Sequence, residues 1–301
     1  MIRSAVLAVT ERSITRKMIT DTSAGRAVAR RFVAGDTLES AIDVARELTG
    51  RGMHVSLDHL GEHVSEIEEA TSARDSYLAC LDEISAHNLD ANISIKLTQL
   101  GMGLDNVAAA RHLDEIALAA RVAGTTVTVD MEESDHTETT VDLYAAAQEK
   151  HGNLGIAVQS YLRRTADDLD RVIPLGGHIR LCKGAYAEPA DVAFQSGGEV
   201  DGSFDRLGIL LMESSGVDVA IASHDDARLE KVLAAAEHRD EPWEFQMLHG
   251  VRRDRQAELV AMGHQMRVYV PYGEAWYPYL TRRMAERPAN LLFFMRAVVG
   301  R

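Results

Sequence analysis

Short runs of apolar and β-branched residues recur from about residue 53 and alternate with longer stretches in which apolar residues return every three or four positions. The short runs are typical of strands buried on both faces, and the longer stretches of amphipathic helices. The predicted strands are residues 53–58, 92–97, 125–131, 154–159, 178–183, 217–223, 244–248 and 266–270. The helices predicted between and after them are residues 65–87, 106–123, 137–151, 165–173, 203–214, 225–237, 252–262 and 274–286.

This alternation predicts an α/β fold, a (β/α)8 barrel of the TIM type that we expect to be distorted, because eight strand–helix units close most economically in that way. We expect residues 1–52 to form a helical segment that packs on the barrel, with Asp36 and Thr37 at the start of its last helix. Residues 53–301 then form the catalytic barrel. A doubly wound sheet is the alternative, but the chain contains neither GxGxxG nor GxxxxGK[ST].

Composition and charge narrow the classes of function. The chain has 301 residues, of which 46% are apolar, and a net charge of −14. The acidic balance argues against nucleic-acid binding, which needs a basic surface. Cys80 and Cys182 form no zinc-binding spacing, so we predict reduced thiols in a cytoplasmic protein. No apolar run is long enough to predict a membrane-spanning helix.

Polar residues stand at the carboxyl end of nearly every predicted strand, which is where a barrel of this kind builds its active site. Burying so many charges at one mouth is costly unless they are paired or used. Cations are in excess there, so we predict an anionic ligand. The cations are Lys96, Arg180, Lys183, Arg282 and Arg283.

The last predicted helix carries a distinctive face. Helical spacing after Pro278 places Tyr279, Arg282, Arg283 and Glu286 on one side. Guanidinium groups bind a carboxylate with two hydrogen bonds, and aromatic rings cover an apolar body. This face therefore suits a small carboxylate on an apolar group, although spacing alone is equally compatible with a solvated helix surface.

Six segments, in order along the chain, resemble those of proline dehydrogenase, the flavin-dependent barrel enzyme of proline catabolism. They are LGE (60–62), SIKLTQLG (94–101), DMEE (130–133), RLCKGAY (180–186), ASHD (222–225) and YLTRRMAER (279–287). The resemblance is to the single-function bacterial form. It implies oxidation of L-proline to Δ1-pyrroline-5-carboxylate, with FAD as cofactor, hydride transfer to flavin N5 and electrons passed to a quinone. It also implies transient contact with the inner face of the cell membrane and a pyrroline-5-carboxylate dehydrogenase downstream.

The resemblance also assigns roles to single residues. It implies that Arg282 and Arg283 grip the proline carboxylate with Lys96, that Glu62 pairs with Arg282 as a gate, and that Asp130 orients the surrounding groups. The implied walls around the substrate ring are Tyr186, Leu248, Tyr269 and Tyr279. The implied cofactor contacts are Gln159, Arg180, Lys183, Gly184, Ala185, Ser223, His224 and Glu286. The sequence departs from the family pattern at Cys182, where an aliphatic residue is commoner, and at Asp225, where we expect an amide.

Two other chemistries fit charged strand ends. A Schiff-base enzyme of the class I aldolase type would use Lys96 or Lys183 as the amine nucleophile. A metal-dependent hydrolase would draw on Asp58, His59, Glu62 and His63, but no HxH stands on a strand, so we predict no metal. A non-enzymatic binding barrel does not account for so many charges.

Overall fold

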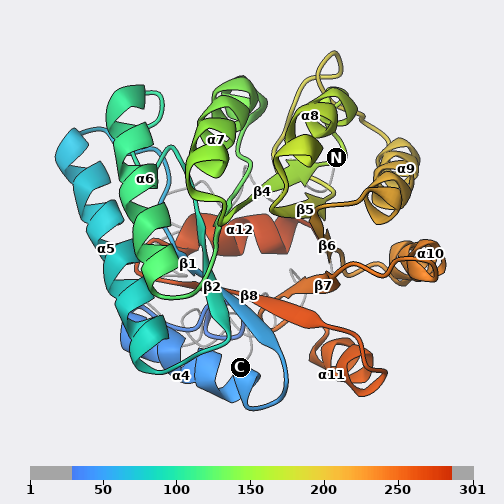
Figure 1. Cartoon of the computed structure of the whole chain (residues 1–301), viewed down its shortest axis with the longest axis horizontal. Coiled ribbons are helices and arrows are strands. Elements are labelled where there is room, and N and C mark those ends of the chain that lie inside the picture. The colour runs from blue at the N-terminus through green and yellow to red at the C-terminus, as the bar shows by residue number, and fades with distance from the viewer. Residues whose placement is uncertain (1–28, 287–301) are drawn as a thin grey trace, which may run out of the picture.

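Eight parallel strands close into a barrel in the computed structural model, which describes residues 29–286 and the side chains of residues 29–281 (Figure 1). Each strand pairs with the next along the chain, and β8 closes the barrel against β1. The strands are β1 (His54–His59), β2 (Ala91–Ile95), β3 (Val127–Val129), β4 (Leu154–Gln159), β5 (His178–Cys182), β6 (Asp218–Ala222), β7 (Trp243–Leu248) and β8 (Met266–Tyr272). The predicted (β/α)8 fold is confirmed, and every predicted strand agrees to within two residues at each end.

Helices surround this barrel. They are α5 (Ile67–Ala86), α6 (Asn106–Val122), α7 (Thr137–His151), α8 (Thr165–Val172), α9 (Gly197–Glu213), α10 (Asp226–Ala236) and α11 (Arg253–Ala261), with short 3-10 helices η1 (Ser134–His136) and η2 (Ile173–Leu175). The prediction was wrong for the start of α9, which we expected at residue 203. Ser196 and Glu199 form a capping box that begins this helix despite the two glycines that follow Ser196.

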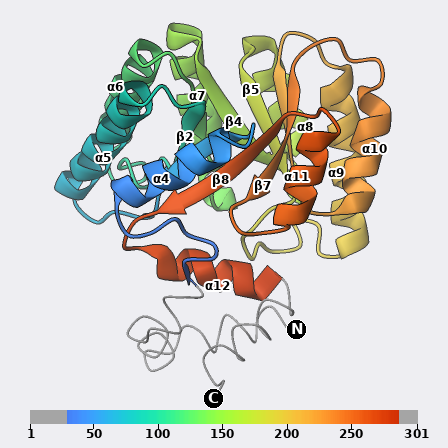
Figure 2. The ribbon, with the colours of Figure 1, turned by 90° about the horizontal axis from the view of Figure 1, so that it is seen from below.

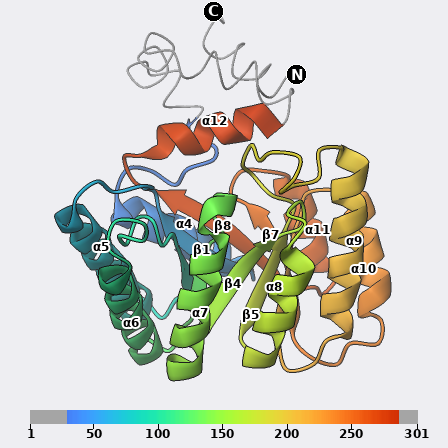
Figure 3. The same cartoon turned by 90° about the horizontal axis from the view of Figure 1, so that it is seen from above.

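The last helix leaves the outer ring. α12 (Trp276–Glu286) lies across the end of the barrel to which β8 leads, and α4 (Leu38–Thr49) packs against β8 and β1 instead (Figures 2 and 3). The Thr37 side chain accepts a hydrogen bond from the Ser40 N–H, so the predicted start of α4 is confirmed. The barrel is therefore distorted, with its final helix placed over the mouth. The proposed division at residue 52 stays a prediction, because residues 1–28 lie outside the described part.

The main core lies between the strands and the surrounding helices. Leu57, Ile93 and Phe204 are among the side chains that are completely buried there. The barrel interior is polar below the mouth, where Glu244 accepts a 2.7 Å hydrogen bond from Arg267. Burial raises the pKa of Glu244, but the charge of Arg267 and a hydrogen bond from His54 outweigh it and hold that pKa below its ordinary value. Within residues 29–286, no helix is long and apolar enough to cross a membrane.

Candidate active site

A cavity of about 740 Å³ opens at the carboxyl ends of the strands, and α12 contributes Tyr279 to its lining. Residues far apart in the sequence meet there because parallel strands deliver their carboxyl ends to one mouth. The predicted site residues that line it are Lys96, Asp130, Gln159, Arg180, Lys183, Gly184, Ala185, Tyr186, Ser223, His224, Leu248, Tyr269 and Tyr279. The structure therefore brings together most of the predicted site.

A network of buried charges forms the floor of this cavity. The Lys96 ammonium donates to both carboxylate oxygens of Asp58, at 3.1 and 3.2 Å, and to Asp130 at 3.4 Å. Asp130 also accepts hydrogen bonds from Arg180 at 2.6 Å and from the Tyr269 hydroxyl at 2.7 Å. Two cations thus share two carboxylates, which is how buried charges are tolerated.

Burial and charge act in opposite directions on these groups. Burial lowers the pKa of Lys96, but the charges of Asp58 and Asp130 outweigh it, so the pKa is raised and the ammonium stays protonated. Burial also raises the pKa of Asp58, and Lys96 only partly offsets this. For Asp130, the charges of Lys96 and Arg180 outweigh burial and lower the pKa. Their environments therefore shift the pKa values of the two carboxyl groups in opposite directions, which is characteristic of functional sites.

Arg180 is held so that one nitrogen remains available. Its Nε donates to Gln246 at 2.5 Å and its Nη1 to Asp130 at 2.6 Å. Gln246 in turn donates to Glu244 at 2.6 Å, which fixes its amide with the carbonyl toward Arg180. Nη2 of Arg180 is buried and has no hydrogen-bond partner among the described residues. A buried donor of this kind fits a cofactor with acceptor atoms, such as a flavin.

Backbone and amide groups shape the side of the cavity next to β4 and β5. Gln159 donates to the Glu132 carbonyl at 2.9 Å and accepts from the Ala185 N–H at 3.3 Å. Gly184 has a φ of +122°, and an added Cβ would overlap the ring of Tyr161. Packing against Tyr161 therefore gives a reason for this glycine that is independent of any cofactor.

The structure explains why an aspartate can stand at position 225, where the family pattern has an amide. Asp225 caps α10 by accepting from the Ala227 N–H, and its other oxygen lies 2.8 Å from the Lys183 ammonium. Asp201 of α9 pairs with the same ammonium at 2.5 Å. An amide at position 225 would supply the cap but not the negative charge, so this chain neutralises Lys183 more completely than the expected pattern does.

The structure adds residues that the sequence did not assign to the predicted flavin and proline site. Asp58 and Gln246 are buried in the cavity and bond to Lys96 and Arg180. Arg252, which also lines it, donates to the His224 carbonyl at 2.9 Å. The position of Asp58 near the end of the first strand was the available signal, but beside His59 it suggested a metal ligand.

Part of the prediction is not placed in the cavity. Glu62 is half-buried and does not line it, although its charge is among those that raise the pKa of Lys96. The side chains of Arg282, Arg283 and Glu286 lie outside the described residues, although their backbone belongs to α12. The helical spacing predicted for that face is thus confirmed, and its contacts stay a prediction.

The metal alternative is not supported by the arrangement of its residues. Asp58 is taken up by Lys96 rather than grouped with His63. The atoms that come within 4.8 Å of one another in the described part of the chain belong to His63, Glu132 and Glu133. Glu132 already accepts hydrogen bonds from the Thr98 N–H and hydroxyl, so we assign no metal to this group.

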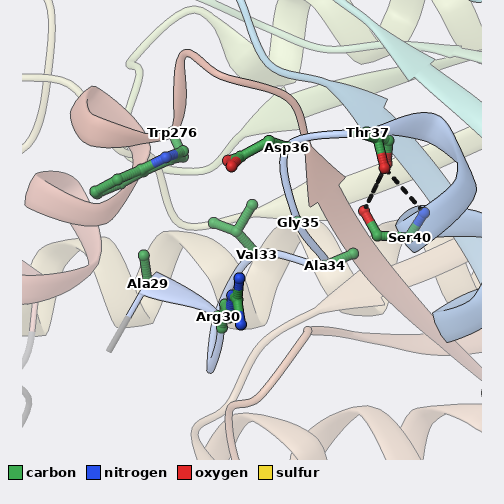
Figure 4. A pocket seen from close by; sticks show the side chains of 9 residues that line it. All are labelled: Ala29, Arg30, Val33, Ala34, Gly35, Asp36, Thr37, Ser40 and Trp276. Carbon is green, nitrogen blue, oxygen red and sulfur yellow. Dashed lines mark hydrogen bonds between the residues drawn. The ribbon is translucent and has the colours of Figure 1, made fainter. Parts of the chain in front are cut away.

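A smaller cavity of about 420 Å³ lies between residues 29–40 and Trp276 (Figure 4). Thr37 and Ser40 at its rim are hydrogen-bonded to each other at the start of α4. None of the predicted site residues lines this cavity. The larger cavity at the strand ends is therefore the candidate active site.

Glu132 gives a prediction for stability against pH. Burial raises its pKa from 4.5 to about 7, so the folded protein binds a proton that the unfolded chain has released. Its contribution to stability is fully present below pH 4.5 and is lost as pH rises to about 7. Glu132→Gln removes this loss, so the variant should gain up to about 3 kcal/mol relative to the wild type between pH 5 and pH 8. Urea unfolding at both pH values measures the difference.

Glu133→Gln is the matched control, because Glu133 is the neighbouring carboxylate and is only half-buried. Its stability at the same two pH values gives the effect of losing a neighbouring carboxylate, which here also contacts His63. A difference between Glu132→Gln and wild type that is the same at pH 5 and pH 8 would show that Glu132 does not titrate abnormally.

Comparison with known proteins identifies relatives along most of the chain. The family model described as proline dehydrogenase matches residues 41–296. Proline dehydrogenase 1 of Bacillus subtilis subsp. natto is 41% identical over 275 residues, which cover 90% of each chain. Proline dehydrogenase of Deinococcus radiodurans is 34% identical over 306 residues, covering 99% of this chain and 97% of that protein.

A solved structure has the same fold. Proline utilization A from Bdellovibrio bacteriovorus superposes with a TM-score of 0.81 at 23% identity. The match covers 87% of this chain but only 33% of that protein, so this chain spans about a third of its length.

Proposed function

The chain belongs to the proline dehydrogenase family of oxidoreductases, and on that premise we propose that it oxidises L-proline to Δ1-pyrroline-5-carboxylate with FAD at the barrel mouth. Proline oxidation is the first step of proline catabolism. The observation that carries the proposal is the buried network of Asp58, Lys96, Asp130 and Arg180 beneath α12.

Two features of the cavity support FAD as the cofactor. Arg180 keeps a buried N–H group without a partner in the described part of the chain, and Gln159 fixes the Ala185 backbone at the cavity edge. When bound, FAD supplies the acceptor, at its N5 atom, for the hydride that leaves C5 of proline. The other residues proposed to hold it are Lys183, Gly184, Ser223, His224 and Glu286.

The substrate part of the proposal rests on charge and shape. Lys96 is a protonated cation at the cavity floor, and α12 carries Arg282 and Arg283 across the mouth. Together they would bind the carboxylate, with Glu62 closing the gate on Arg282. Four side chains would enclose the apolar ring, and these are Tyr186, Leu248, Tyr269 and Tyr279.

The contribution of the protein to catalysis is placement. Asp130 accepts hydrogen bonds from Lys96, Arg180 and Tyr269, and so fixes a substrate cation, a cofactor cation and a ring wall relative to one another. Holding reactants in one geometry accelerates a reaction because the entropy of bringing them together is lost on binding. Asp130 and Tyr269 therefore belong to the proposed catalytic set with Lys96, Arg282 and Arg283.

The proposal includes the partners of the reaction. Electrons would leave for a quinone during transient contact with the inner face of the cell membrane, and the protein would otherwise be cytoplasmic. Its product would be consumed by a pyrroline-5-carboxylate dehydrogenase.

The Schiff-base alternative is less compatible with the geometry. An amine nucleophile needs a lowered pKa, whereas that of Lys96 is raised by two carboxylates. Lys183 is bound by Asp201 and Asp225. The Lys96 ammonium is therefore not set up to lose its proton, and both carboxylates beside Lys183 are paired with its ammonium.

Anaerobic titration of the FAD-loaded protein with L-proline tests the proposed function. We expect a yellow protein whose absorbance near ~450 nm is bleached by about one equivalent of proline. The proposal would be overturned if the protein bound no flavin and borohydride linked it covalently to a carbonyl substrate. That result would favour the Schiff-base chemistry.

A further inference from the structure

We propose that Asp58 is a positioning residue that aims the Lys96 ammonium into the cavity and keeps it positively charged, and that it thereby sets the affinity for the substrate carboxylate. This inference rests on the proposed function, because it takes Lys96 as a carboxylate-binding cation. Asp58 itself would not touch the substrate.

The geometry gives Asp58 and Asp130 different tasks. Asp58 lies on β1, its side chain is 1% exposed, and both of its oxygens accept hydrogen bonds from Lys96. Asp130 lies farther from Lys96, at 3.4 Å, and one of its oxygens is 2.6 Å from Arg180. Its other oxygen accepts from the Tyr269 hydroxyl at 2.7 Å. Asp58 is therefore the nearer carboxylate partner of Lys96, and Asp130 is shared among three donors.

The ammonium of Lys96 would point elsewhere without this anchor. A lysine side chain has many rotamers, and two hydrogen bonds that it donates to one carboxylate select a single direction. That direction places Nζ 3.4 Å from the Tyr269 hydroxyl, which belongs to the proposed wall of the substrate ring. Asp58 on β1 is completely buried, whereas Lys96 keeps a small exposed surface and lines the cavity.

The electrostatic argument agrees with the geometry. Burial lowers the pKa of Lys96, and the surrounding carboxylates and the Tyr186 phenol raise that pKa. Removing the charge of Asp58 leaves burial opposed mainly by Asp130, so the pKa of Lys96 should fall, which favours loss of its proton at alkaline pH. The groups that face Lys96 are Asp58 on β1, Glu62 after β1, Asp130 and Glu132 after β3, Tyr186 after β5 and Tyr269 on β8.

The test uses a ligand that binds but does not react. Cyclopentanecarboxylate has the carboxylate and the five-membered ring of proline but no nitrogen, so it cannot be oxidised to an imine. Its inhibition constant against L-proline is measured for the FAD-loaded wild type, Asp58→Asn, Lys96→Met and the double variant, at about pH 6.5 and about pH 9. Asp90→Asn, an exposed carboxylate beyond the other end of the barrel, is the matched control for loss of one negative charge.

We expect Asp58→Asn to weaken inhibitor binding by about 10- to 100-fold at pH 9 and by clearly less at pH 6.5. KM for proline should follow the inhibition constant, and kcat should change by a smaller factor. In the Lys96→Met background the same substitution should change binding by less than about threefold, because the residue through which Asp58 acts is gone. Circular dichroism checks that the folded state is kept.

Two results would overturn the inference. One is unchanged inhibitor binding by Asp58→Asn at both pH values. The other is an effect of Asp58→Asn that is as large with Met at position 96 as with Lys. If Asp58→Asn alone does not fold, inhibitor binding is compared between Lys96→Met and the double variant. The double variant lacks both charges of the ion pair and so leaves neither buried without its partner. A change in binding of more than about threefold between these two variants would contradict the inference. Failure of the wild type itself to be bleached by proline would contradict the proposed function instead.

Discussion

Asp130→Asn is expected to lower kcat/KM for proline by at least about 100-fold, because small misplacements of reacting groups have effects of that size. The carboxylate accepts hydrogen bonds from Lys96, Arg180 and Tyr269, and the amide cannot accept all three or neutralise the two cations. The substitution should also destabilise the fold by about 3 kcal/mol, because the buried charges of Lys96 and Arg180 lose a carboxylate partner. Steady-state oxidation of proline with an artificial acceptor, together with urea unfolding, measures both effects.

The stability effect should depend on pH. Lys96 and Arg180 hold the pKa of Asp130 below its ordinary value despite burial, so its contribution is present above that ordinary value and is lost in acid. The difference in the free energy of unfolding between the wild type and Asp130→Asn should therefore shrink as the pH falls below the ordinary pKa of an aspartate side chain. Asp135→Asn removes an exposed neighbouring carboxylate in η1 and should leave kcat/KM unchanged. A kcat/KM for Asp130→Asn within threefold of the wild type would contradict the role given to this network.

The second large effect is expected at the arginine pair of α12. Arg282→Met and Arg283→Met should each raise KM for proline by about 10- to 150-fold, since each removes a charge-assisted hydrogen bond of about 1.5–3 kcal/mol. Inhibition by cyclopentanecarboxylate should weaken by similar factors, because the carboxylate alone is bound there.

Arg121→Met is the matched control, since Arg121 is an exposed arginine in the last turn of another helix, α6. It should leave KM unchanged. A near-normal KM in both α12 variants would show that the carboxylate is held elsewhere.

The repeating units of the fold were predictable from the sequence because each buried strand is a short, continuous apolar run. The start of α9 was not predicted, since Gly197 and Gly198 resemble a loop and the capping box that offsets them acts locally. The positions of α4 and α12 were not predicted either: α4 packs beside β8 and β1, and α12 lies across the end of the barrel. Both helices are amphipathic, and only the tertiary structure decides which surface each covers.

The candidate site was predictable where a strand end carries a charge. Lys96 and Asp130 follow their strands directly, and the fold brings them within 3.4 Å of each other. Asp58 and Gln246 were not assigned to the predicted flavin and proline site, because their significance depends on the partners they meet across the barrel. Spacing along one strand does not encode such pairs.

The position at which proline is oxidised tests the central claim most directly. L-Proline that carries two deuterium atoms at C5 should give a cyclic imine that retains one of them, and loss of flavin absorbance in a single turnover should slow with a primary isotope effect. Hydride removal from C5 requires both results. A product that retains both deuterium atoms would place the oxidation at C2 and contradict the account.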